Sequence, residues 1–231
     1  MQKRIIRKLD LEMLLSQVEP YTSPKPSLEQ YTIPVDVAAT MLYIAAYTYN
    51  SIIGKTVLDL GCGTGRLALG ASFLGAKQTV GIDIDKTAIK VAIENSVKTG
   101  LKNKVQWITA DIDAVCGNFD TVLQNPPFGV QKRKADRKFL EKALEVGRTI
   151  YSLHKSPYKD KGLIRKLKTG KTNIVPVSPA PFLESFIEEH NGTIKAVYTM
   201  WMTIPKTFSF HTKRKHEFTV DFYVIEGKPK R

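Results

Sequence analysis

The chain has 231 residues, of which 42% are hydrophobic, enough for one globular domain with a sizeable core. Lys and Arg number 35 against 22 Asp and Glu, so the formal charge is +13, an excess that favours a polyanionic partner such as RNA or DNA. No run of about 18 apolar residues occurs and no apolar segment follows the basic N-terminus, so neither a membrane span nor a signal peptide is expected.

The two cysteines, Cys62 and Cys116, have neither the spacing of metal ligands nor the pattern of a disulfide framework. We therefore expect reduced thiols in a cytoplasmic protein. His211 and His216 are five residues apart with no cysteine nearby, so no metal site is expected there either.

The first 50 residues are predicted to form a helical extension. Ile5, Leu9 and Met13, followed by further leucines, recur at helical spacing and predict an amphipathic helix that ends near Pro20. A connector rich in Pro and Ser follows at 22–27, and residues 38–49 predict a second helix, apolar enough to be largely buried.

Strands and helices are predicted to alternate over residues 51–156. Asp85 is placed to cap one of the helices. Such alternation predicts an α/β fold with a parallel, doubly wound sheet covered on both faces. The expected strands are 55–61, 79–84, 105–110, 119–124 and 148–153, and the expected helices are 64–74, 86–99 and 136–146.

The remainder of the chain is less regular. Residues 157–178 are basic and broken by Gly and Pro, and they predict a surface excursion. Residues 182–189 predict a helix, and the β-branched stretches 194–203 and 217–225 predict a pair of long strands within the last unit, 179–231.

A glycine-rich loop, residues 59–65 (DLGCGTG), stands where a strand is predicted to meet a helix, which suits a ligand that approaches backbone closely. A phosphate loop has a Gly, four further residues and then Gly-Lys-Ser/Thr. The two Gly-Lys-Thr triplets of this chain have Tyr49 and Arg165 where that first Gly is required, so neither fits. A dinucleotide fingerprint needs a third Gly where Arg66 stands. The pattern that remains is the Asp-x-Gly-x-Gly-x-Gly form of class I methyltransferases, whose cofactor is S-adenosylmethionine.

Two acids follow this loop at the ends of the next two predicted strands. Asp83 is placed to accept both ribose hydroxyls of the cofactor, and Asp111 to accept from its adenine amino group. Each could instead be a helix cap or a turn residue, although we assign the cap to Asp85. The joint placement of loop and acids favours S-adenosylmethionine.

The Asn-Pro-Pro-Phe sequence follows the fourth predicted strand, over the edge where such sheets bind ligands. The alternative is a plain turn. An exocyclic purine amine is a poor nucleophile, but the Asn125 side-chain oxygen and the Pro126 carbonyl can accept from its two N–H bonds and draw its nitrogen toward tetrahedral geometry. Pro127 helps to fix this backbone, and Phe128 can stack on the base.

Several segments together resemble the methyltransferase-like protein five family and its archaeal relatives. The resemblance implies a class I methyltransferase that forms N6-methyladenosine in small-subunit ribosomal RNA and works with a small zinc-binding activator. With it we predict one methyltransferase domain whose mostly parallel, seven-stranded Rossmann-like sheet has an antiparallel C-terminal strand, residues 1–50 forming the cofactor lid. The segments are 28–31 (LEQY), 59–65, 81–85 (GIDID), 125–129, 151–156 (YSLHKS) and 205–210 with the basic stretch after it.

The resemblance also implies a set of cofactor contacts. Thr64 and Arg66 would act mainly through backbone N–H groups. The family usually has a threonine where this chain has Ile33, so a backbone or apolar contact is expected there. The full predicted set is Gln30, Ile33, Asp59, Gly61, Gly63, Thr64, Arg66, Asp83, Asp111 and Ile112.

His154 could be a base, but a packed residue at a strand end is the preferred interpretation.

Two basic clusters flank the proposed active edge and are predicted to contact RNA phosphates, although a solvated basic face is the competing interpretation. The clusters are Lys132, Arg133 and Lys134, and Lys213, Arg214 and Lys215.

Three other functions compete. A glutamine-amide methyltransferase uses a similar motif, usually with Tyr in place of Phe128, and a DNA adenine methyltransferase is also compatible with the sequence. An RNA-binding assembly factor with a vestigial pocket is the alternative outside the enzymes. The presence of Asp83, Asp111 and Asn125 argues against the loss of a working cofactor pocket.

Overall fold

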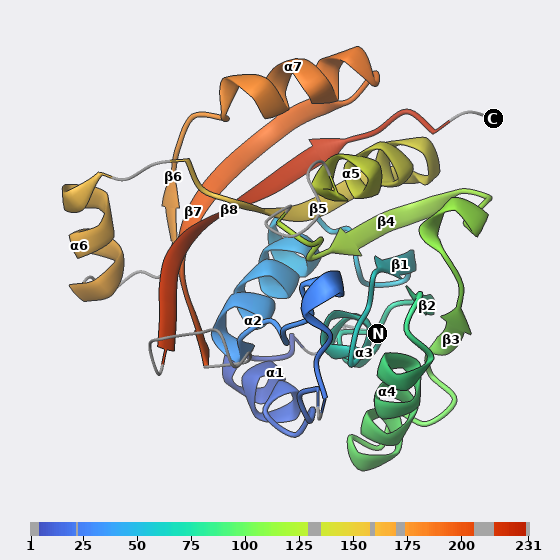
Figure 1. Ribbon diagram of the computed structural model, residues 1–231. Coiled ribbons are helices and arrows are strands. Elements are labelled where there is room, and N and C mark those ends of the chain that lie inside the picture. Colours follow the sequence, from blue (N-terminus) through green and yellow to red (C-terminus); the bar gives the residue numbers. More distant parts are fainter. Residues whose placement is uncertain are drawn as a thin grey trace.

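The computed structural model describes residues 5–21, 23–128, 135–157, 160–169, 174–205 and 215–229. These residues form one eight-stranded sheet in the order β3-β2-β1-β4-β5-β8-β7-β6, with helices against both faces (Figure 1). The strands are β1 Thr56–Leu60, β2 Gln78–Asp83, β3 Gln106–Thr109, β4 Phe119–Gln124, β5 Gly147–Lys155, β6 Ile174–Pro176, β7 Thr193–Pro205 and β8 Lys215–Glu226.

The first five strands are parallel, β8 runs antiparallel to β5, and β7 and β6 follow in alternating direction. The predicted α/β, mostly parallel sheet is therefore confirmed. The helices are α1 Lys8–Leu15, α2 Val35–Tyr43, α3 Arg66–Phe73, α4 Lys86–Lys98, α5 Ala135–Val146, α6 Lys161–Thr169 and α7 Pro181–Glu189, with short turns η1 Pro26–Leu28, η2 Ile44–Thr48 and η3 Ile112–Ala114.

The sheet has eight strands where seven were predicted, and the extra one comes from residues 157–178. That stretch holds helix α6 and strand β6, regular elements that the sequence analysis did not predict. β6 has only three residues, too few to show a period, and it exists because Ile174 and Val175 pair with β7. Long-range pairing of this kind leaves no local signal.

Two layers of apolar side chains hold the helices on the sheet. On one face α1 packs on α2 and α3, of which α2 lies against β7 and α3 against β1, β2 and β4; on the other face α5 packs against β4 and β5, and α7 against β7. Both β1 and β4 are buried along most of their length, as expected for parallel strands that are covered on both faces.

The predicted first helix is confirmed as α1, but only part of its predicted apolar face is buried: Leu14 and Leu15 are buried, whereas Leu9 and Met13 are not. Ile5, Leu9 and Met13 are 57–66% exposed, whereas Leu11 and Leu15 are fully buried against α2 and α3. The segment has apolar residues all around, so periodicity alone could not select the face.

Candidate active site

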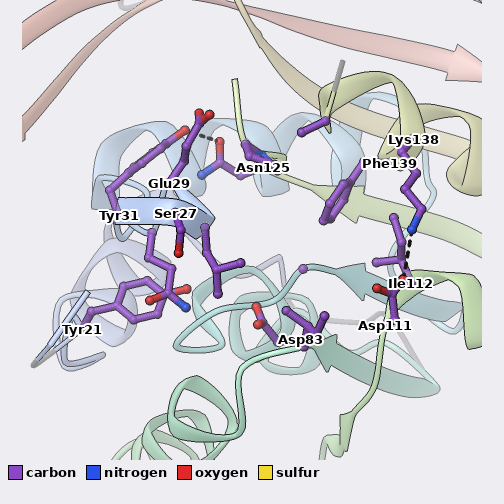
Figure 2. Close-up of a pocket in the computed structure, with 16 residues that line it drawn as sticks. Tyr21, Ser27, Glu29, Tyr31, Asp83, Asp111, Ile112, Asn125, Lys138 and Phe139 are labelled. Carbon is purple, nitrogen blue, oxygen red and sulfur yellow. Dashed lines mark hydrogen bonds and ion pairs between the residues drawn. The ribbon is translucent and has the colours of Figure 1, made fainter. Parts of the chain in front are cut away.

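A cavity of about 250 Å³ opens at the carboxyl ends of β1, β2 and β4, and residues of the segment between α1 and α2, called the N-terminal segment below, also line it. Figure 2 shows Asn125 and Asp83 on opposite sides of this cavity. A smaller cavity of about 30 Å³ adjoins it and shares Gly61 and Asn125 with it. The larger cavity is lined by the predicted residues Gln30, Gly61, Asp83, Asp111, Ile112, Asn125 and Pro127, and the smaller by Ile33, Asp59, Gly61, Gly63, Thr64, Arg66 and Asn125.

The glycine loop connects β1 to α3. Gly61 has φ +73°, and a Cβ there would stand 2.6 Å from the ring of Phe139, so only glycine lets the loop and α5 approach this closely. Gly65 is the N-cap of α3. The loop therefore presents backbone and the start of a helix to the cavity, as its sequence predicts.

Asp83 holds the glycine loop against the end of β2. Its buried carboxylate accepts from the N–H of Gly63 and the N–H of Asp85, both at 2.8 Å. Burial raises the pKa of Asp83 and these bonds act in the opposite direction. The carboxylate lines the cavity, where its remaining lone pairs can accept hydroxyl groups.

Asp85 caps α4 as predicted, because it accepts from the N–H of Thr87 at 3.0 Å. It also binds two side chains of the N-terminal segment, Lys25 Nζ and Gln30 Nε2, each at 2.8 Å. Burial raises the pKa of Asp85, but the bonds from Gln30 and Lys25 outweigh it and leave the pKa below its ordinary value. Gln30 is thus a tether of the segment as well as a lining residue.

Arg66 ties the same segment down from the other side. Its guanidinium donates to the carbonyl oxygens of Val18 (2.8 Å) and Ile33. Burial lowers the pKa of Arg66 to about 10, which leaves it charged at neutral pH. The resemblance implied backbone contacts at Arg66, and its side chain has this additional, structural role.

Asp111 follows β3 and caps the short turn η3, where it accepts from the N–H of Asp113 at 3.0 Å. Lys138 of α5 donates to Asp111 at 3.3 Å and to Asp113 at 2.7 Å. Asp111 and Ile112 also line the cavity. The turn role and the lining role of Asp111 therefore coexist.

Tyr31 is a site residue that the sequence analysis did not single out. Its hydroxyl donates to Asn125 Oδ1 at 3.1 Å, and its ring lies 5.7 Å from that of Phe128, which meets Phe218 edge-on at 5.8 Å (centroid distances). The only signal was its place beside Gln30 in the LEQY segment. Of the catalytic motif, Asn125 and Pro127 line the larger cavity, whereas Pro126 and Phe128 are not among its lining residues.

His154 is a packed residue, which confirms the preferred interpretation. It is 3% exposed, its Nε2 lies 2.8 Å from Ser152 Oγ, and its ring meets Tyr223 edge-on. Burial lowers the pKa of His154 to about 4, so it is neutral at physiological pH.

Most of the two predicted RNA-binding clusters lies outside the described residues. This applies to Lys132, Arg133, Lys134, Lys213 and Arg214, whereas Lys215 begins β8 and is exposed. Within the described ranges no three His, Cys, Asp or Glu side chains are grouped as metal ligands. None of the helices in those ranges has the length and apolar character needed to cross a bilayer.

The sheet order, the glycine loop and the acids that follow it define a class I methyltransferase. The family model for ribosomal protein L11 methyltransferase (PrmA) matches residues 38–126. The rRNA N(6)-adenosine-methyltransferase Mettl5 of Drosophila melanogaster is 33% identical over 94% of both chains, and that of Danio rerio (METTL5) is 31% identical over 92% of this chain and 95% of its own.

A solved structure agrees with these relatives. PH1948 from Pyrococcus horikoshii, described as an RNA methyltransferase, superposes with a TM-score of 0.79 at 35% identity, covering 97% of this chain and 99% of its own. The chain belongs to the Mettl5 family of S-adenosylmethionine-dependent methyltransferases.

Asp59, in the glycine loop, makes the stability of the protein depend on pH. It is fully buried and accepts from the N–H of Ala68 at 2.8 Å, and burial raises its pKa to about 7 from 3.8. The folded state therefore binds this proton more tightly than the unfolded chain, so the contribution of Asp59 to stability falls as pH rises from about 4 to about 7.

Asp59→Asn keeps an oxygen acceptor and removes the titration. The free energy of unfolding is measured with denaturant at about pH 5 and about pH 8. Its decrease from the lower to the higher pH should be smaller in Asp59→Asn than in the parent. Asp120→Asn is the control, since bonds from Thr56 lower the pKa of Asp120 and its titration lies below this window. An unchanged pH slope in Asp59→Asn would contradict the assignment.

Proposed function

We propose that the protein methylates the N6 amine of an adenine in small-subunit ribosomal RNA. One observation carries the proposal: the glycine loop, Asp83 and the Asn125 amide line a single cavity, so a cofactor and a planar amine can meet there. The names of the full-length relatives support rRNA adenosine, and the charge of +13 supports a polyanionic substrate. Both cysteines are free thiols, in keeping with a cytoplasmic enzyme.

A protein substrate, the class to which the glutamine-amide alternative belongs, has weaker support. The match to the L11 methyltransferase family ends at Pro126, so it covers the cofactor half and stops inside the catalytic motif. The relatives named for rRNA adenosine match 92–94% of the chain, so their similarity extends well beyond that motif. That difference favours RNA over protein as substrate.

The cofactor would be held by the residues that line the two cavities. Asp83 would accept the ribose hydroxyls, Asp111 would accept from the adenine amino group, and the N–H groups at the start of α3 would face the polar end of the cofactor. When bound, S-adenosylmethionine supplies an electrophilic methyl group on a sulfonium.

The chain's own contribution to catalysis is hydrogen-bond acceptance. Asn125 Oδ1 and the Pro126 carbonyl would each accept from one N–H of the target amine and free its lone pair from the purine ring. Phe128 would stack on the flipped base. His154 is neutral and bonded to Ser152, so the scheme uses no histidine base.

Substitution separates chemistry from cofactor binding at this site. Asn125→Ala should lower turnover by about 100-fold or more, the scale of one lost transition-state hydrogen bond, with S-adenosylmethionine affinity nearly unchanged. Asp83→Ala should do the reverse and weaken cofactor binding by about 1–3 kcal/mol. Calorimetry and single-turnover kinetics measure the two effects. The scheme is wrong if the whole defect of Asn125→Ala is lost cofactor binding.

The RNA would also contact α6, which follows β5 at the same end of the sheet as Asn125 follows β4. α6 is anchored by buried Leu167 and by Lys168, which lies 4.2 Å from the Trp201 ring centroid and 3.1 Å from Glu217. Its exposed residues include Lys161, Arg165 and Lys166. Figure 1 shows the helix standing outside β6 and β7, where an RNA backbone can reach it.

Replacing Lys161, Arg165 and Lys166 with Gln should reduce the slope of log binding constant against log salt by about 2–3, because each phosphate contact contributes slightly less than one. The matched control replaces Lys77, Lys102 and Lys104, three exposed lysines at the opposite ends of β2 and β3, and should leave the slope nearly unchanged. Equal slopes in the two triple variants would favour a solvated basic face.

For the activator subunit we propose the open edge of β3. In the described part of the chain β3 pairs with β2 on one side, so its other side presents backbone groups that an added strand can bind. Ile108 of β3 and Ile93 and Val97 of α4 lie beside that edge and are 44–54% exposed. An apolar surface next to an unpaired edge suits a protein partner.

Ile108→Glu should abolish co-purification with a small zinc-binding activator. The solubility of the chain without its partner should stay nearly unchanged. Met13→Glu, at an equally exposed apolar position on α1, is the control and should leave the complex intact. The proposal fails if Met13→Glu rather than Ile108→Glu breaks the complex, or if the isolated chain is fully active on its RNA.

A further inference from the structure

The hydroxyl of Tyr31 occupies one lone pair of the oxygen that the target amine needs. It donates to Asn125 Oδ1 at 3.1 Å, on the wall of the cavity (Figure 2). An amide oxygen has two lone pairs, so this bond leaves one available for the substrate. The inference drawn from this contact rests on the proposed function, since it concerns the same acceptor.

An asparagine amide has two ends of nearly equal shape and opposite hydrogen-bonding character. With Oδ1 toward the substrate it accepts from the amine, whereas after a rotation of about 180° it would present Nδ2, a donor, to another donor. Only one orientation can assist the reaction, and neighbouring groups must select it.

Tyr31 provides that selection. Burial raises the pKa of Tyr31 well above its ordinary value, so its hydroxyl stays protonated and can donate at any working pH. If the amide rotated, this donation to Oδ1 would be replaced by one from Nδ2 to the phenol oxygen, which is a weaker acceptor than an amide oxygen because its lone pair is delocalised into the ring. The hydrogen bond therefore favours the orientation in which the amide is a substrate acceptor.

The hydroxyl is itself held in place from two directions. The Tyr31 ring packs against Phe128, and the backbone is tethered on either side by Gln30 to Asp85 and by Ile33 to Arg66. A donor fixed in this way can orient its acceptor, because little freedom is left for it to follow a rotated amide.

We propose that Tyr31 is a positioning residue that holds the Asn125 amide with Oδ1 toward the N6 amine of the target adenine. The residue that contacts substrate is Asn125, and Tyr31 acts through it. The N-terminal segment thereby does more than cover the cofactor, since it also sets the orientation of the catalytic amide.

A double-mutant cycle tests this role. Tyr31→Phe keeps the ring that packs on Phe128 and removes only the donor. In the parent it should lower kcat by about 10-fold, while the affinity for S-adenosylmethionine changes by less than about 2-fold. Asn125→Asp replaces the amide with two equivalent oxygens, which need no orientation. In that background Tyr31→Phe should change kcat by less than about 2-fold.

A merely structural Tyr31 would behave differently, because loss of packing lowers kcat by the same factor in both backgrounds. Equal factors, or no effect of Tyr31→Phe in the parent, overturn the proposal. Identification of the methylated product is run alongside. If the product is not N6-methyladenosine, the proposed function fails, but the cycle on the true substrate still decides whether Tyr31 orients Asn125.

A spectroscopic measurement keeps the test independent of activity. In ¹⁵N-labelled protein the Asn125 Nδ2 protons, assigned by their absence in Asn125→Asp, should give one sharp pair of signals. In Tyr31→Phe the pair should broaden or double as the amide samples both orientations. An unchanged pair in Tyr31→Phe contradicts the role.

Discussion

The parallel pairing of β1 with β2 on one side and β4 on the other is the constraint on which the site depends. Leu58 of β1 lies opposite Val80 of β2 and Val122 of β4, so the three strands end at the same edge of the sheet. The glycine loop and Asn125 follow β1 and β4 directly, and Asp83 is the last residue of β2. Residues more than 60 positions apart in the chain therefore share one cavity without any flexible element to bring them together.

The N-terminal segment completes what the sheet edge begins. Two polar anchors hold it, the Asp85 carboxylate at one end and the Arg66 guanidinium at the other. Between them Tyr31 reaches Asn125, so the groups assigned to cofactor binding and to catalysis are connected through the hydrogen bonds and the backbone of this segment. Buried polar groups of this kind are costly to leave unpaired, which makes the position of the segment well determined.

Local chemistry explains how much of this could be predicted. Strand and helix periods placed the parallel half of the sheet, and the order of glycine loop, Asp83 and Asn125 identified the cavity residues before any contact was known. The cap at Asp85 was predicted from position alone. Such features follow from a few neighbouring residues, so the sequence displays them directly.

The features that were not predicted depend on residues distant in the chain. Nothing local at Tyr31 indicates Asn125, and nothing at Gln30 indicates Asp85. Strand β6 requires β7, and the buried face of α1 is chosen by α2 and α3 rather than by its own period. Tertiary packing decides each of these.

The most direct test of the account is to supply methyl-labelled S-adenosylmethionine to the protein with ribosomal RNA, DNA and total protein from cells that lack it. The label should appear in small-subunit RNA as N6-methyladenosine, identified by mass spectrometry of the nucleosides. Label recovered in glutamine, in DNA or in large-subunit RNA, with none in small-subunit RNA, would contradict it.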